Sequence, residues 1–273
     1  MNLRSKNNIT YHSLVILRNL ESTFTFNPMK ILLQTILIIL AVTTASAEQA
    51  LEITHLTGDV YVYTTYHDYN HQPFPSNGMY IVTNEGVVMI DTPWDTTQFQ
   101  PLLDSIYARH RQRVVLCIAT HFHDDRSAGL DYYKQKGVRT FTSKQTYELC
   151  AAEGNARAEF TFTDDTTFTV GKHTFRAYYP GAGHTKDNIV VWMNNEKILY
   201  GGCLVKSVDN DGLGNIADAN LTAWAPTIKN VIRTFPNPKF IIPGHFSWTD
   251  TGALKHTLML LQKHGKMNKK SRK

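Results

Sequence analysis

The chain has 273 residues, of which 42% are hydrophobic and 19% are charged, and its formal net charge is +5. This composition excludes a disordered, collagen-like or coiled-coil protein and one that crosses a membrane repeatedly. The positive charge lies at the two ends, since residues 1–47 carry +3 and the last eight residues carry +5, which leaves −3 between them. The positive net charge of the chain therefore does not indicate nucleic acid as a partner.

The first 47 residues read as a leader for export. Lys30 is followed by the apolar residues 31–42 and by Ala45-Ser46-Ala47, which is typical of a signal peptide and its cleavage site. The apolar run is shorter than the roughly 20 residues that span a bilayer. We expect translation to start at Met29, cleavage to follow Ala47, and the mature protein to be periplasmic without stable membrane anchoring. The alternative is an uncleaved membrane anchor.

Residues 48–265 read as a single α/β domain, followed by a basic tail, residues 266–273, that we expect to be disordered. Helices and strands are predicted from apolar periodicity and β-branched runs. The first half has strands at residues 60–64, 79–83, 87–90, 114–119 and 138–141, and helices at 99–109, 127–136 and 144–153. The second half has strands at residues 168–170, 173–179, 189–193, 198–200 and 240–242, and helices at 221–235 and 253–264. Two such halves predict two sheets packed face to face, with helices outside and loops of both halves along one edge.

A candidate metal site follows the buried strand at residues 114–119. There the chain reads His121-Phe-His123-Asp-Asp125, so that two imidazoles and a carboxylate alternate along an extended segment and project to the same side. Imidazoles and carboxylates gathered in this way are costly to bury without a shared cation. The motif therefore predicts a bound metal ion.

Three more candidate ligands follow apolar strands in glycine-rich turns. They are His184, Cys203 and His245, each preceded directly by glycine. Glycine lets the backbone approach a crowded centre closely. Cys203 is also the cysteine that packing explains least, because Cys117 and Cys150 lie in segments where a small buried hydrophobe is expected. An odd number of widely spaced cysteines is a poor disulfide framework.

The order of these motifs resembles the metallo-β-lactamase superfamily, and specifically the cysteine-containing first subclass of class B β-lactamases, over residues 50–265. The resemblance implies a four-layer αβ/βα sandwich, with two mixed β-sheets face to face and helices outside. It also implies two zinc ions per chain. One would be held by His121, His123 and His184, and the other by Asp125, Cys203 and His245.

The resemblance implies a hydrolase that opens the β-lactam amide of penicillins, cephalosporins and carbapenems by a zinc-bound hydroxide and so confers antibiotic resistance. Three neutral imidazoles leave a fourth position for water, and zinc lowers the pKa of that water from 15.7 to about 7. Asp125 and Asn215 are the expected catalytic residues, and Asn215 would donate to the lactam carbonyl. Lys206 would bind the carboxylate of the substrate, with Asn215 as the second substrate-binding residue. We expect a monomer whose partners are small-molecule β-lactams and not nucleic acid.

Two features have competing interpretations. Asp91 resembles a carboxylate that lies below the zinc ligands, although it could equally cap a turn. The aromatic segment from Tyr63 to Gly78, which contains Tyr66, Tyr69 and Phe74, is expected to be a mobile loop that covers the substrate, although ordinary hairpin aromatics would look the same.

Two other functions stay open at this point. One is another metallohydrolase on the same scaffold, such as a lactonase or thioesterase. Enzymes of that kind usually have His where this chain has Arg126 and Asp where it has Cys203, which argues against them. The other is a periplasmic zinc-binding protein without turnover, and the intact group of three histidines argues against that.

Overall fold

The computed structural model describes residues 51–163 and 165–270, with only the backbone described for residues 268–270. The expected leader and its cleavage site lie outside these residues. Within the described part of the chain, no helix is both long enough and apolar enough to cross a membrane.

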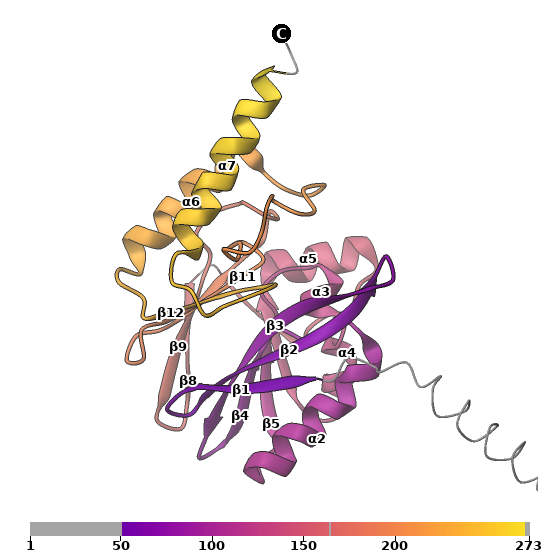
Figure 1. The fold of residues 1–273 in the computed structure, drawn as a ribbon. Coiled ribbons are helices and arrows are strands. Elements are labelled where there is room, and N and C mark those ends of the chain that lie inside the picture. The colour runs from indigo at the N-terminus through magenta and orange to yellow at the C-terminus, as the bar shows by residue number, and fades with distance from the viewer. Residues whose placement is uncertain (1–50, 164, 271–273) are drawn as a thin grey trace, which may run out of the picture. The chain divides into compact units, whose positions relative to one another are not determined.

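The first half of the chain forms a seven-stranded sheet whose strands follow one another in chain order (Figure 1). The first four strands pair antiparallel and the last four pair parallel. Its strands are β1 (Glu52–Thr57), β2 (Val60–Tyr69), β3 (Gln72–Thr83), β4 (Gly86–Ile90), β5 (Val114–Ile118), β6 (Arg139–Ser143) and β7 (Phe160–Phe162). The connections contain η1 (Thr96–Gln98), α2 (Phe99–His110), α3 (Asp124–Ser127), α4 (Leu130–Gln135) and α5 (Lys144–Glu153).

The second half forms a five-stranded sheet in the order β12-β11-β10-β9-β8, antiparallel except for the parallel pair β11 and β12. Its strands are β8 (Asp165–Val170), β9 (His173–Tyr178), β10 (Val190–Met193), β11 (Ile198–Gly202) and β12 (Phe240–Pro243). Helices α6 (Leu221–Thr234) and α7 (Ala253–Lys270) belong to this half and pack against each other.

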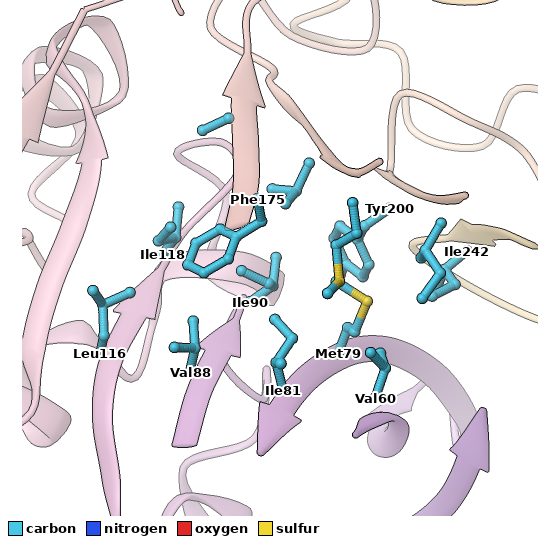
Figure 2. Packing of buried hydrophobic residues seen from close by; sticks show 14 of the residues in the cluster. Val60, Met79, Ile81, Val88, Ile90, Leu116, Ile118, Phe175, Tyr200 and Ile242 are labelled. Carbon is cyan, nitrogen blue, oxygen red and sulfur yellow. The ribbon is translucent and has the colours of Figure 1, made fainter. Parts of the chain in front are cut away.

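Alternation along the strands creates three hydrophobic layers. Val88 and Ile90 of β4 face the second sheet, in the layer that also holds Phe175 and Ile242 (Figure 2). Val87 and Met89 point the other way, into a layer shared with α2 and α4. A third layer lies between the second sheet and helices α6 and α7, around Trp224. Because successive side chains of a strand face opposite sides, each sheet is buried on both faces. The predicted four-layer sandwich is therefore confirmed.

The segment from Tyr63 to Gly78 differs from the expected loop. It is a regular β-hairpin in which β2 and β3 pair as far as Tyr69 and Gln72, and the turn residues Asn70 and His71 have φ of 55° and 60°. Residues 72–78 of β3 have no ladder partner on their other edge, since β4 begins to pair only at Met79. Proline is tolerated at such an edge, so the prolines of this segment do not prevent a strand.

Three further differences concern helices and strands that the sequence predicted otherwise or did not predict. The predicted helix at residues 127–136 is divided at Ala128 and Gly129 into α3 and α4, and strands β1 and β7 were not predicted. Helix α7 continues to Lys270, so the expectation of a disordered tail is wrong for residues 266–270. Lysine and methionine are good helix formers, and no proline interrupts this segment.

Candidate metal centre

Four of the six predicted metal ligands follow the ends of strands, whereas His184 lies in the loop between β9 and β10 and Asp125 lies in α3. His121 and His123 follow β5, Cys203 follows β11, and His245 follows β12. Strands β11 and β12 are parallel and adjacent, with Gly202 opposite Pro243, so that Cys203 and His245 leave the sheet side by side. A Cβ atom at Gly244 would lie 2.6 Å from the Cys203 sulfur. Glycine is therefore required for the two segments to approach.

The first group of ligands consists of three imidazoles. His121, His123 and His184 each offer a nitrogen, and the three atoms lie within 4.8 Å of one another. Nε2 of His121 lies 3.2 Å from Nδ1 of His123. Burial lowers the pKa of His121 and of His184 well below the ordinary value, so both rings are neutral, as metal ligands must be. Nδ1 of His184 is buried and has no hydrogen-bond partner among the described residues.

The second group consists of a carboxylate, a thiol and an imidazole. The Cys203 sulfur lies 3.2 Å from Oδ2 of Asp125 and 3.3 Å from Nε2 of His245, and those two atoms are 3.0 Å apart. Nδ1 of His245 lies 2.7 Å from the carbonyl oxygen of Pro75, to which it can donate, so Nε2 is left to face the group. Burial raises the pKa of the Cys203 thiol well above its ordinary value. A thiolate at this position therefore needs a cation beside it.

This donor set fits zinc. Imidazole nitrogens, a thiolate and a carboxylate are the ligands that zinc takes in proteins. The two groups adjoin, because Nε2 of His121 lies 3.7 Å from Oδ1 of Asp125. The geometry thus brings all six predicted ligands together as two neighbouring groups of three.

Arg126 lies beneath the second group with its side chain fully buried. Its guanidinium donates to Oδ2 of Asp125 at 3.1 Å and to the carbonyl oxygen of Gly244 at 2.7 Å. Burial by itself would raise the pKa of Asp125, but Arg126, together with His245 and His121, holds it well below its ordinary value. Arg126 therefore keeps the carboxylate ionised and fixes the backbone that carries His245.

Asp91 is also buried, at the end of β4, but no ligand side chain is among its hydrogen-bond partners in the described residues. Its carboxylate accepts from the Thr120 backbone N–H at 2.7 Å, the Thr120 hydroxyl at 2.9 Å and the Tyr200 hydroxyl at 2.7 Å. It thereby fixes the residue that directly precedes His121. None of these three bonds closes a local turn, so the contacts do not support the interpretation of Asp91 as a turn cap.

Asp218 was missed by the sequence analysis. Its Oδ2 lies 2.9 Å from Nε2 of His123, which leaves Nδ1 of that ring facing the other imidazoles. Asp218 comes only three residues after Asn215 in the same polar loop, but 95 residues separate it from His123. A contact of such long range has no local sequence signal.

The two predicted substrate-binding residues lie on neighbouring segments. Lys206 is buried, with Nζ 5.4 Å from the centre of the Trp224 ring, and burial lowers the pKa of its ammonium group. Asn215 is exposed, and its Oδ1 accepts from the Ala217 N–H at 3.0 Å. A Cβ atom at Gly214 would lie 3.9 Å from Nζ of Lys206, so the loop that carries Asn215 runs past the lysine.

The β2–β3 hairpin adjoins the second ligand group through Phe74, one of the three aromatic residues that the sequence analysis named. The Phe74 ring centre lies 5.0 Å from that of His245 and 5.1 Å from that of Phe246. Tyr66 instead donates to Glu52, and Tyr69 is 56% exposed. The hairpin is thus anchored at the ligands by Phe74.

Comparison with known proteins shows the family of this chain. The model of the Metallo-beta-lactamase superfamily matches residues 71–245. Metallo-beta-lactamase type 2 of Elizabethkingia meningoseptica is 41% identical over 220 residues, which is 81% of this chain and 88% of that protein. Metallo-beta-lactamase IND-1 of Chryseobacterium indologenes is 37% identical over 208 residues, or 76% and 87% of the two proteins.

Solved structures show the same fold. The metallo-beta-lactamase from Pontibacter korlensis has a TM-score of 0.76 and 40% identity, and the match covers 78% of this chain and 99% of that one. Metallo-beta-lactamase IND-7 also has a TM-score of 0.76, with 36% identity and the same coverage. The chain therefore belongs to the metallo-β-lactamase superfamily and is a hydrolase, as the order of its metal-binding motifs predicted.

Proposed function

We propose that this protein is a periplasmic, zinc-dependent β-lactamase that hydrolyses the amide bond of penicillins, cephalosporins and carbapenems and so confers antibiotic resistance. The observation that carries the proposal is the pairing of three histidines with an adjoining Asp125, Cys203 and His245 group. The relatives reported above, which share this fold and 36–41% of their sequence, carry the name metallo-β-lactamase.

Two zinc ions fit the donor set. His121, His123 and His184 would hold one, and Asp125, Cys203 and His245 the other. Zinc bound by three neutral imidazoles makes water ionise near neutral pH and polarises a carbonyl. Asp125 is an expected catalytic residue as well as an expected ligand. Nε of Arg126 donates to its Oδ2 at 3.1 Å and so keeps the carboxylate ionised.

The protein's own side chains would hold the substrate beside the metal ligands. Lys206 is a buried cation on the segment that also carries Cys203, so its ammonium group can bind the carboxylate common to these antibiotics. The Asn215 amide can donate to the lactam carbonyl as negative charge develops on its oxygen. Phe74 lies against His245, where its ring would exclude water from the reacting amide.

The deciding experiment follows the ultraviolet absorbance of a penicillin, a cephalosporin and a carbapenem with purified residues 48–273. We expect opening of all three rings, loss of activity with a zinc chelator, and recovery when zinc is restored. Metal analysis of the same sample should give about two zinc ions per chain. A Lys239→Ala variant, which changes an exposed lysine at the start of β12, is the matched control and should retain full activity.

Other results would lead to different conclusions. A protein that binds two zinc ions but opens none of the three rings would be tested on lactone and thioester substrates, and turnover of those would replace the β-lactamase proposal. Zinc binding without turnover of any substrate would identify a binding protein. Fractionation of cells that express the full chain tests the periplasmic location, and activity retained in the cytoplasm would contradict export.

A further inference from the structure

One face of α7 is exposed and carries both lysine and methionine. Its described residues are Lys255, Met259, Lys263, Lys266 and Met267, all of them exposed, and we call this set the α7 basic face. Met259 is 55% exposed and Met267 is 53% exposed. With 3.6 residues per turn, the five positions fall within an arc of about 120° around the helix.

The opposite side of α7 attaches the helix to the domain. Ala253, Leu254 and Leu260 are buried in the hydrophobic layer that α7 shares with α6 and the second sheet. Figure 1 shows the C-terminal part of α7 running beyond α6 and away from both sheets. The five side chains of the α7 basic face take no part in that layer, although His256, which lies within the same arc, has its Nε2 2.8 Å from the carbonyl oxygen of Asn210.

The sequence concentrates positive charge on this part of the chain. Residues 251–273 contain seven lysines and arginines and no acidic residue, whereas residues 48–250 have 17 basic and 22 acidic residues, a net charge of −5. Among the ion pairs of the described residues, none involves Lys255, Lys263 or Lys266. The positive charge of the helix is thus separated from a body of the opposite sign and is not neutralised by it.

We propose that the α7 basic face binds the surface of an anionic lipid bilayer, reversibly and without insertion of a helix across it. Each lysine near an anionic headgroup layer strengthens such binding, and the methionine side chains can enter the boundary between headgroups and acyl chains. Exposed methionines between the lysines would gain nothing from the phosphate backbone of a nucleic acid. Their presence therefore favours a lipid bilayer over nucleic acid as the partner. The negative body would face away from the membrane.

The test measures co-sedimentation of residues 48–273 with vesicles. This part of the chain contains every residue that the structure describes. The vesicles contain phosphatidylcholine alone or with about one-third phosphatidylglycerol, and the salt is low or about 0.5 M, where charge is screened over a few ångström. We expect binding only to the anionic vesicles and only at low salt.

Matched variants distinguish the α7 basic face from net charge. The variant K255E/K263E/K266E should bind anionic vesicles about 100-fold more weakly, since each lysine contributes roughly a factor of five. The variant K136E/K144E/K239E makes the same change in net charge at exposed lysines of other elements and should bind within about threefold of the unchanged protein. The variant M259S/M267S should bind several-fold more weakly and keep its salt dependence. Circular dichroism confirms that each variant is folded.

Several results would overturn the proposal. Equal binding to neutral and anionic vesicles, or no binding to either, would remove the bilayer as a partner. Equal loss in the two triple variants would assign the effect to overall charge. Tighter binding to duplex DNA than to the anionic vesicles, lost in K255E/K263E/K266E, would assign the α7 basic face to nucleic acid. Because none of these measurements uses catalysis, the result is independent of the proposed β-lactamase activity.

Discussion

Oδ2 of Asp218 lies 2.9 Å from Nε2 of His123, and this contact ties the polar loop that follows Lys206 to the group of three histidines. A carboxylate on the outer nitrogen of a metal-binding imidazole fixes the tautomer and the orientation of the ring. The same loop carries Asn215, so that a proposed zinc ligand and a proposed substrate-binding residue are positioned by one segment.

Asp218→Asn should weaken zinc binding at the three histidines by about 10- to 100-fold, because the amide cannot supply the negative charge that holds the ring. The dissociation constant is measured by competition with a chromophoric chelator. Asp211→Asn, an exposed change in the same loop, is the control and should leave zinc affinity unchanged. An unaltered affinity in the Asp218 variant would show that the contact does not position His123.

Cys203→Ser should lower the bound zinc from about two ions to about one per chain, because a hydroxyl is a much weaker ligand than a thiolate. Turnover should fall severely while the fold is kept. Metal analysis and β-lactam hydrolysis are measured on the same preparation. Cys150→Ala removes another buried thiol, which belongs to neither group of candidate ligands, and it should keep both zinc ions. Unchanged metal content and activity in Cys203→Ser would refute its role as a ligand.

Lys206→Ala should mainly raise KM for carboxylate-bearing lactams and leave kcat little changed, because the buried ammonium group would bind the ground state and transition state alike. Initial rates over a range of substrate concentrations separate the two constants. Lys186→Ala alters an exposed lysine and should change neither. An effect confined to kcat would point away from binding of the substrate carboxylate.

The six proposed ligands could be predicted because each comes after an apolar strand and each has a local signal, either the His-x-His-x-Asp segment or a glycine directly before it. His121, His123 and Asp125 lie in one short segment, and glycine marks the turns before Cys203 and His245. The layers followed from continuous apolar runs such as Val87 to Ile90, which are typical of strands buried on both faces. The ligand motifs and the apolar runs can both be recognised from residues that are neighbours in the sequence.

What could not be predicted depends on contacts between distant residues. Strand β3 contains prolines and still pairs with β2 along the hairpin. The prolines are tolerated because β4 does not pair with that part of β3, and the sequence does not show this. The contact of Asp218 with His123 and the burial of Arg126 beneath Asp125 and Gly244 likewise arise from packing. Asp91 was ambiguous in the sequence for the same reason, because its partners Thr120 and Tyr200 lie on other strands.

Gln98→Ala should loosen the hairpin. The Gln98 side chain accepts from the Tyr66 N–H and donates to the Tyr66 carbonyl oxygen, each at 3.0 Å, and so acts like one more residue of a neighbouring strand. Loss of the two bonds should lower the free energy of unfolding by about 1–3 kcal/mol and speed amide exchange at Tyr66. Denaturant unfolding and hydrogen exchange measure both effects. Gln100→Ala is the control, because its side chain bonds only within the helical layer. Unchanged exchange at Tyr66 would contradict the prediction.

Asp91→Asn should change how stability depends on pH. Burial raises the pKa of Asp91 from 3.8 to about 6 in the folded protein, despite the opposing effect of Arg126. Between these two values the folded state binds more protons than the unfolded state. The contribution of Asp91 to the free energy of unfolding is therefore present below pH 3.8 and is lost as the pH rises through about 6.

The unchanged protein should thus lose about 2.5 kcal/mol of stability relative to Asp91→Asn between pH 4 and pH 7, since one pKa unit corresponds to 1.36 kcal/mol and part of the loss occurs below pH 4. Urea unfolding of both proteins in the presence of a zinc chelator measures the difference at each pH. Asp211→Asn serves again as the exposed control and should follow the unchanged protein at every pH. A difference that stays constant, or that favours the unchanged protein as the pH rises, would mean that Arg126 fully offsets the effect of burial on Asp91.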